Sequence, residues 1–210
     1  MKSGSCSTVR VKICGVTSRR DAFAAVDAGA DAVGFNFHRA SPRCVTPALA
    51  RSIVRALPPL VTPVGVFVDR PASDVRRICR TTGIRLAQLH GDEPPAALRA
   101  LEPLPVMKAI RVRDRGCVRS AAWYGRAALL LFDAYDASAY GGSGHRFNWA
   151  LLKGFRRPFL LAGGLTPANV ARAVRAVRPF GVDVASGVES RPGIKDHRKM
   201  RSFVRSAKSA

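Results

Sequence analysis

Short apolar runs rich in β-branched residues recur along the chain, and segments with the helical spacing of apolar positions lie between them. This alternation is typical of a parallel sheet that is covered by helices. The apolar runs predict eight strands. Their approximate bounds are Val9–Cys14, Ala32–Phe37, Val61–Val68, Leu86–His90, Val106–Val112, Ala127–Asp133, Phe159–Gly163 and Gly181–Ser186.

Helix signals separate several of these strands. Thr46-Pro47 and Thr166-Pro167 each place a capping hydroxyl directly before a proline that suits the first helical turn. The segment Gly116–Tyr124 is a weaker helix candidate, and the segment Asn148–Lys153 is short. We therefore expect that one or two helices of the outer layer are reduced.

The number of strands and the length of the chain together indicate the fold class. Eight β-then-α units in 210 residues fit the compact limit of a closed (β/α)8 barrel, whereas an open doubly wound sheet normally has fewer strands. The predicted class is therefore α/β, with a single parallel eight-stranded (β/α)8 (TIM) barrel. Since a chain of this length supports one sizeable core, residues 1–210 are expected to form one domain, with a short flexible N-terminus over residues 1–8.

Two side chains at predicted strand ends supply the main candidate chemistry. Cys14 ends the first predicted strand, and Asp133 ends the apolar run of the sixth. In a barrel both strand ends face one mouth, where a thiol and a carboxyl group can serve as a base and an acid in proton transfer. The alternatives are a cysteine that merely packs in the core and a carboxylate that caps the following loop.

Other polar side chains surround this pair. Strand alternation places Lys12 on the same face as Cys14, and an ammonium group there would favour the thiolate. Cys14 could then serve as a base, provided that its pKa is lowered toward neutrality. Asp183, in the last predicted strand, could bind a substrate hydroxyl or a lysine such as Lys12. His90 could line the pocket, or it could be a structural histidine whose hydrogen bonds are satisfied.

Glycine-rich turns after several strands could hold a phosphate group. Glycine exposes backbone amides, and a helix N-terminus adds favourable partial charge for an anion. Phosphate sites after strands seven and eight recur in barrels of this kind. The candidate phosphate-binding residues are Gly142, Gly163, Gly164, Ser186 and Gly187. No P-loop pattern is present and no dinucleotide fingerprint follows the first strand, so we expect no nucleotide cofactor.

The chain is strongly basic, with 35 Lys and Arg residues against 14 Asp and Glu residues and a formal charge of +21. Such a charge can serve nucleic-acid binding or the steering of an anionic substrate. It can also reflect solvated helix faces in an arginine-rich proteome, and the even spread of the charge favours this last interpretation. A basic RNA-binding module would show clustered arginines with interleaved aromatics, but aromatic residues make up only 7% of the chain.

The apolar runs and the cysteines indicate the compartment. The longest apolar runs are far shorter than the roughly 20 residues that span a bilayer, and no apolar stretch follows Lys2. The five cysteines lie at wide, irregular spacings that indicate neither a disulfide framework nor a zinc cluster. We therefore expect no membrane association, no metal site and a reducing cytoplasm.

Short motifs from about Val9 to the C-terminus resemble, in their order, those of the phosphoribosylanthranilate isomerase family. Each motif is modest alone, whereas the ordered set is highly specific. The motifs are Lys12-Ile13-Cys14-Gly15-Val16-Thr17, Ser41-Pro42-Arg43, Gly65-Val66-Phe67-Val68, Gln88-Leu89-His90-Gly91, Leu131-Phe132-Asp133, Gly141-Gly142-Ser143-Gly144, Ala162-Gly163-Gly164-Leu165 and Ser186-Gly187-Val188-Glu189.

This resemblance implies the Amadori rearrangement of N-(5-phosphoribosyl)anthranilate in tryptophan biosynthesis, without a metal or an organic cofactor. It implies that Asp133 protonates the ribose ring oxygen as the general acid and that Cys14 takes the C2 proton as the general base. Arg43 matches the family arginine that contacts the anthranilate carboxylate. The expected partner is a small anionic phosphosugar rather than a nucleic acid. The sequence leaves the oligomeric state open and slightly favours a monomer.

The nearest rival is the isomerase of histidine biosynthesis, which performs the same rearrangement on a substrate with two phosphates. That enzyme should carry a glycine-rich cradle in each half of its chain. Here Asp69-Arg70-Pro71-Ala72, after the third predicted strand, offers no such cradle. A single phosphate site therefore fits the sequence better.

Overall fold

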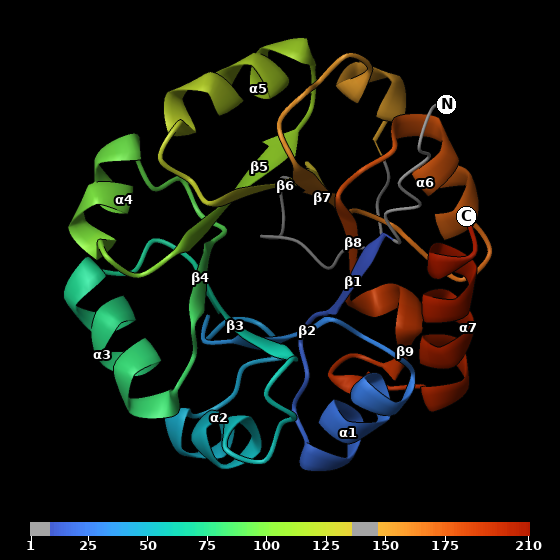
Figure 1. Cartoon of the computed structure of the whole chain (residues 1–210). Helices are drawn as coiled ribbons and strands as arrows, with labels where there is room; N and C mark the ends of the chain where they lie inside the picture. Colours follow the sequence, from blue (N-terminus) through green and yellow to red (C-terminus); the bar gives the residue numbers. More distant parts are fainter. Residues whose placement is uncertain (1–8, 136–146) are drawn as a thin grey trace, which may run out of the picture.

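The computed structural model describes residues 9–135 and 147–210. Within these residues, eight parallel strands close into a barrel in the order of the sequence, and helices cover its outside (Figure 1). The last strand pairs with the first, so the predicted closed (β/α)8 barrel is confirmed. The N-terminal residues 1–8 and the phosphate-binding candidate Gly142 lie outside the described residues.

The barrel strands agree with their predicted bounds to within two residues at each end. The strands are β1 (Arg10–Ile13), β2 (Ala32–Asn36), β3 (Thr62–Phe67), β4 (Leu86–Leu89), β5 (Val106–Val112), β6 (Leu129–Ala134), β7 (Phe159–Leu161) and β8 (Gly181–Val184). Cys14 therefore follows β1 directly, and Asp133 is the penultimate residue of β6.

A small antiparallel hairpin follows β8 and was not predicted. It consists of β9 (Glu189–Arg191) and β10 (Ile194–Lys195). Strands this short carry no measurable apolar alternation, and the charged residues around Pro192 and Gly193 are typical of a loop. Gly193 has a φ of +82°, a left-handed conformation that glycine adopts without steric cost.

The α-helices lie on the outside of the barrel, and Figure 1 shows them as a ring around the strands. Their bounds are α1 (Arg19–Asp27), α2 (Pro47–Val54), α3 (Ala72–Thr82), α4 (Pro95–Leu101), α5 (Arg115–Ser120), α6 (Val170–Val177) and α7 (His197–Lys208). The Thr46 side chain accepts a hydrogen bond from the Leu49 backbone N–H, so the predicted start of α2 is confirmed.

The outer layer is reduced on the side of β6, as predicted. Helix α5 has six residues and continues into the 3₁₀ helix η1 (Ala121–Tyr124). Between β6 and β7, the described residues form only the 3₁₀ turn η2 (Trp149–Leu152).

The predicted start of a helix at Thr166-Pro167 was wrong. Helix α6 begins at Val170, with Asn169 as its N-cap. The Asn169 side chain accepts a hydrogen bond from the Thr166 N–H at 2.9 Å and donates one to the Gly164 carbonyl at 2.9 Å. This side chain holds residues 164–169 as a turn, which delays the helix by one turn.

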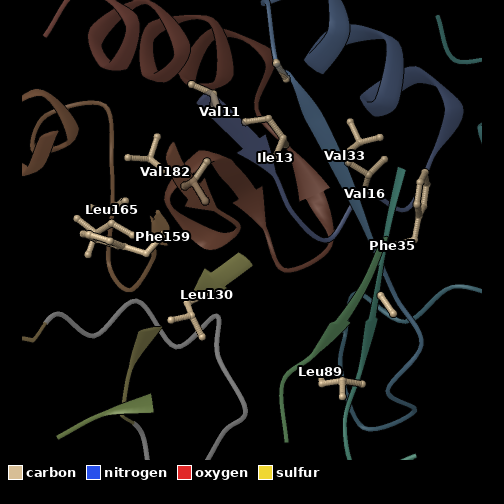
Figure 2. Close-up of a cluster of buried hydrophobic side chains, with 14 of the residues drawn as sticks. Val11, Ile13, Val16, Val33, Phe35, Leu89, Leu130, Phe159, Leu165 and Val182 are labelled. Atoms are coloured by element: carbon tan, nitrogen blue, oxygen red, sulfur yellow. The ribbon is translucent and has the colours of Figure 1, made fainter. Parts of the chain in front are cut away.

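The main hydrophobic core lies between the barrel strands and the helices. Alternation along β1 sends Val11 and Ile13 into this core, and Figure 2 shows them close to side chains from β2 and β8. The inside of the barrel holds a smaller cluster. It consists of Met107, Ala109, Leu131, Leu160 and Ala162. One step further along the inner face of β6, Leu131 is followed by Asp133, so the interior becomes polar toward the carboxyl ends of the strands.

The packing of α7 generates a stability prediction. The Phe203 side chain of α7 is 0% exposed, so Phe203→Ala is expected to lower the free energy of unfolding by about 3–5 kcal/mol. Phe180→Ala is the matched control, because that ring is 50% exposed, and its expected cost is about 1 kcal/mol. Urea unfolding at an unchanged m-value measures both. Equal losses would contradict the burial of α7 against the barrel.

Candidate active site

Cys14 lies on the inner face of the barrel at its carboxyl end. Its backbone N–H donates to the Val184 carbonyl of β8 at 2.8 Å, which continues the pairing of β1 with β8. A Cβ atom added at Gly34 of β2 would lie 2.9 Å from the Cys14 sulfur, so the thiol lies directly over this glycine. Strand alternation therefore aims Cys14 as the sequence predicts, and only glycine leaves room for the sulfur.

Lys12 and Asp183 form a buried ion pair beside Cys14. Lys12 Nζ donates to Asp183 Oδ1 at 2.8 Å, and both side chains are buried. Of the two alternatives for Asp183, the structure shows the contact with a lysine, while the contact with a substrate hydroxyl stays a prediction. Although burial opposes the charge of Lys12, the neighbouring Asp183 carboxylate holds the pKa of this lysine above its usual value.

The thiol itself is less acidic than the sequence suggests. Burial raises the pKa of Cys14 above its ordinary value, and the attraction of the Lys12 ammonium does not outweigh it. The Asp183 carboxylate adds to the upward shift, since it counteracts the field of Lys12 at the sulfur. The condition stated above, a pKa of Cys14 lowered toward neutrality, is therefore not met, because the lysine is already paired with a carboxylate.

Asp133 is held by its own backbone and by His90. Its Oδ1 accepts from the Ala134 N–H at 2.8 Å, and its Oδ2 lies 3.1 Å from His90 Nε2. The other ring nitrogen, His90 Nδ1, lies 2.7 Å from Gln88 Nε2. If the Gln88 amide donates to Nδ1, the Nε2–H of the neutral ring donates to Asp133. His90 therefore joins the pocket as a partner of the candidate acid.

Gln88 was not identified as a site residue from the sequence. It lies in β4, two residues before His90, so alternation sends both side chains to the inner face. Its Oε1 atom is buried and has no hydrogen-bond partner among the described residues. The inward alternation was the only sequence signal for this residue.

The glycine turns after β7 and β8 come together next to Asp133. Gly163 and Gly164 have φ values of +84° and +59°, which favour glycine. A Cβ atom at Gly163 would lie 3.1 Å from Asp133 Oδ1, so this turn passes directly beside the carboxyl group. A Cβ atom at Gly187, which follows Ser186 in the 3₁₀ turn η3 (Ser186–Val188), would collide with the Leu165 carbonyl oxygen. The two turns therefore touch, as the prediction of a shared phosphate site requires.

Arg43 is buried and is held by Glu189, the first residue of β9. Its Nε and Nη2 donate to Glu189 Oε1 and Oε2 at 2.9 and 2.8 Å. Lys195 Nζ donates to the same Glu189 Oε1 at 2.8 Å. Burial alone would raise the pKa of Glu189, but the hydrogen bonds from Arg43 and the charge of Lys195 hold it below the usual value. The sequence did not reveal these partners, since 146 residues separate Arg43 from Glu189.

The residues that the structure describes contain neither a group of metal ligands nor a membrane-spanning helix. No group of three or more His, Cys, Asp and Glu side chains gathers there in an arrangement that could hold a metal ion. No helix there has the length and apolar character needed to cross a membrane.

Comparisons with known proteins give one family. Residues 11–206 match the family described as N-(5'phosphoribosyl)anthranilate (PRA) isomerase. The N-(5'-phosphoribosyl)anthranilate isomerase of Trichlorobacter lovleyi is 51% identical over 207 residues, which cover 96% of this chain and 99% of that protein. The Geobacter sulfurreducens protein of the same name is 52% identical over 203 residues, which cover 95% of this chain and 98% of its own.

Solved structures agree with the sequence comparison. The crystal structure of phosphoribosyl anthranilate isomerase from Thermotoga maritima has a TM-score of 0.91 at 40% identity, and covers 96% of this chain and 100% of its own. A phosphoribosyl anthranilate isomerase in complex with reduced 1-(o-carboxyphenylamino)-1-deoxyribulose 5-phosphate has a TM-score of 0.87 at 40% identity and the same coverage. Because the family match spans nearly the whole chain and relatives share about half of its residues, the chain belongs to the N-(5'-phosphoribosyl)anthranilate isomerase family.

Proposed function

We propose that this chain converts N-(5-phosphoribosyl)anthranilate into 1-(2-carboxyphenylamino)-1-deoxyribulose 5-phosphate, the isomerase step of tryptophan biosynthesis, with Cys14 as the base and Asp133 as the acid. The observation that carries the proposal is the shared position of these two groups. In a member of this family, both lie on the inner face at the carboxyl end of the barrel, next to glycine turns that suit a phosphate.

Asp133 opens the ribose ring in the first step. Its carboxyl proton passes to the ring oxygen as the bond between C1 and that oxygen breaks, and the lone pair of the anthranilate nitrogen forms the Schiff base at C1. The carboxylate left behind accepts hydrogen bonds from the Ala134 N–H and, in the tautomer assigned above, from His90 Nε2. Donors placed before the charge develops stabilise it without reorganisation.

Cys14 acts in the second step. The thiolate takes the proton from C2, and the electrons of that C–H bond form a double bond between C1 and C2. The π electrons of the protonated Schiff base then move to its nitrogen, which gives an enolamine. Tautomerisation of the enolamine then yields the ketone. Since the pKa of Cys14 is raised, the thiolate is a minor form near neutral pH, but it is a stronger base toward a C–H bond.

The remaining candidates bind the substrate. The backbone amides at Gly163, Gly164, Ser186 and Gly187 would hold the phosphate, and Gly142 would add to them. Arg43 would contact the anthranilate carboxylate, for which a planar guanidinium is better suited than an ammonium group. Asp183 would accept a hydrogen bond from a ribose hydroxyl. These steps use only proton transfer and polar contacts, so the proposal includes no metal and no organic cofactor.

The proposal also includes the compartment, the partners and the oligomeric state of the enzyme. We infer a reducing cytoplasm, since all four described cysteines, Cys14, Cys44, Cys79 and Cys117, are free thiols. The charge of +21 is dispersed, which fits solvated helix faces, and we propose no nucleic-acid partner. The oligomeric state stays open in this proposal, and the sequence slightly favours a monomer.

The two proton-transfer roles can be tested directly. Cys14→Ala and Asp133→Asn are each expected to lower kcat by about 10²- to 10⁴-fold, the usual contribution of a positioned acid or base. Cys117→Ala, a cysteine change on α5, is the matched control and should keep a near wild-type rate. Only the wild type and this control should restore growth to a tryptophan auxotroph that lacks the isomerase. Rapid turnover by both site variants would contradict the assigned roles.

Arg43→Ala tests the carboxylate contact. We expect KM to rise by about 10- to 100-fold, the value of a charge-assisted hydrogen bond, with a much smaller change in kcat. Steady-state kinetics with N-(5-phosphoribosyl)anthranilate measures both constants. An unchanged KM in a folded variant would remove Arg43 from the substrate site.

The electrostatics of the thiol predict two opposite shifts. Asp183→Asn removes a negative charge that raises the pKa of Cys14, so the variant should show a lower pKa for this thiol. Lys12→Met removes the attraction that opposes burial, so it should raise that pKa further. The rate of alkylation of the Cys14 peptide by iodoacetamide against pH, followed by mass spectrometry, measures both. Alkylation of the exposed Cys44 in the same samples is the control for the reactivity of iodoacetamide. Shifts of the Cys14 pKa in the same direction in both variants would contradict these electrostatic roles.

A further inference from the structure

The mode of binding of Arg43 leaves one edge of its guanidinium for a second carboxylate. Glu189 occupies the edge formed by Nε and Nη2 with a bidentate contact, at 2.9 and 2.8 Å. A guanidinium has five N–H donors, so the edge formed by Nη1 and the second Nη2 hydrogen can bind another planar carboxylate. Glu189 therefore decides the direction in which this second edge points.

The cluster of Arg43, Glu189 and Lys195 carries a net positive charge, which an anion would balance. Arg43, Glu189 and Lys195 are only 8%, 7% and 4% exposed, and the two cations share one carboxylate. An ion whose charge is not balanced is costly to bury. A carboxylate on the substrate would balance the cluster. A merely structural ion pair would not need a second, unmatched cation.

Lys195 links this cluster to the catalytic strand ends. Its ammonium group has three N–H donors, and all three have partners. They are Glu189 Oε1 at 2.8 Å, the Cys14 carbonyl at 2.6 Å and the Ala185 carbonyl at 3.1 Å. Cys14 is the proposed base, and Ala185 precedes the Ser186 turn that would hold the phosphate. One side chain therefore fixes the end of β1, the end of β8 and the partner of Arg43.

The hairpin that carries these residues packs tightly against the segment of Arg43. A Cβ atom at Gly193, in the hairpin turn, would lie 2.9 Å from the Pro42 carbonyl oxygen. Thr17 Oγ1 donates to the Gly193 carbonyl at 2.5 Å. On the other side, a Cβ atom at Gly15 would lie 2.5 Å from Arg43 Cδ. The stem of Arg43 is therefore confined, and its guanidinium has little freedom to choose another direction.

We propose that Glu189 and Lys195 are positioning residues of the isomerase: Glu189 aims the free edge of Arg43 at the substrate carboxylate, and Lys195 fixes the backbone of Cys14 relative to that contact. This inference rests on the proposed function, and it deepens that function by assigning substrate selection to the β9–β10 hairpin. The hairpin, which was not predicted from the sequence, thereby positions the arginine that contacts the carboxylate.

The experiment compares two substrates that differ in one group. They are N-(5-phosphoribosyl)anthranilate and N-(5-phosphoribosyl)aniline, which lacks the carboxylate and can be prepared from ribose 5-phosphate and aniline. For Glu189→Gln we expect kcat/KM to fall by about 10- to 100-fold with the first substrate, mainly through KM. With the second substrate the fall should be less than about threefold, since no carboxylate is there to be aimed at. A general loss of structure would lower both values equally.

Glu93→Gln is the matched control. Glu93 is also buried and also bound to a lysine, since Lys108 Nζ lies 2.7 Å from its Oε2, but it makes no contact with Arg43. We expect this change to lower stability while the ratio of the two kcat/KM values stays that of the wild type. If Glu189→Gln does not fold, Glu189→Asp keeps the charge and withdraws the carboxylate by one carbon. It should then lower the ratio of kcat/KM with N-(5-phosphoribosyl)anthranilate to kcat/KM with N-(5-phosphoribosyl)aniline to an intermediate value, below that of the wild type.

Lys195→Met tests the second half of the proposal. Loss of the bonds to the Cys14 and Ala185 carbonyls should lower kcat by about tenfold or more with both substrates, and should shift the alkylation profile of Cys14 to higher pH. Glu189→Gln should lower kcat much less. An unchanged kcat and alkylation profile in folded Lys195→Met would overturn the role of Lys195.

The outcomes separate this inference from the proposed function. A wild-type chain that does not turn over N-(5-phosphoribosyl)anthranilate contradicts the function itself. An active wild type whose ratio of kcat/KM values is unchanged by Glu189→Gln or Glu189→Asp contradicts only the role of Glu189. A wild type that treats both substrates alike contradicts the aiming of Arg43 at a carboxylate.

Discussion

The first and last strands of the barrel meet at a buried ion pair, and the site depends on it. Lys12 and Asp183 stand opposite each other in the register of β1 and β8, 2.8 Å apart. Removing one partner would leave an uncompensated charge inside the barrel, which is far more costly than the pair itself. A slip of β1 by one residue against β8 would turn Lys12 away from the interior and from Asp183. The pair therefore fixes the seam where the barrel closes, and with it the height of Cys14.

Charge pairing extends this constraint around the mouth. Asp133 lies against His90, and Arg43 lies against Glu189, each with a partner from a different strand or loop. Each contact satisfies a buried polar group that would otherwise be costly, and each joins segments that are distant in the chain. The result is a set of donors and acceptors whose directions are set before a substrate arrives, which is how an enzyme stabilises developing charge at little reorganisation cost.

Sequence reasoning succeeded where a local pattern carries the information. Strand positions follow from apolar runs, and the start of α2 follows from Thr46 and Pro47. Sequence reasoning failed where a specific side-chain contact, rather than a local pattern, determines the structure. Thr166 looks like a helix cap, but the Asn169 side chain closes a turn instead.

The same limit applies to the site. Cys14, Asp133 and the glycine turns were recognised because strand ends converge in a barrel and because their motifs resemble a family. Glu189 and Lys195 serve residues far away in the chain, and no periodicity encodes such pairings. The acidity of Cys14 could not be predicted from the sequence for a related reason, since it depends on burial and on Asp183 as well as on the neighbouring Lys12.

The thin outer layer beside β6 has a consequence for how the acid is supported. Where most strands rest on an α-helix, β6 rests partly on aromatic rings: Phe132 meets Phe155 and Phe159 edge-on, with ring centres 5.0 and 5.4 Å apart. Phe132 immediately precedes Asp133, so these rings pack behind the candidate acid. The support of this carboxyl group therefore comes from ring packing rather than from helix packing, and aliphatic replacements of the rings would loosen it without changing any candidate site residue.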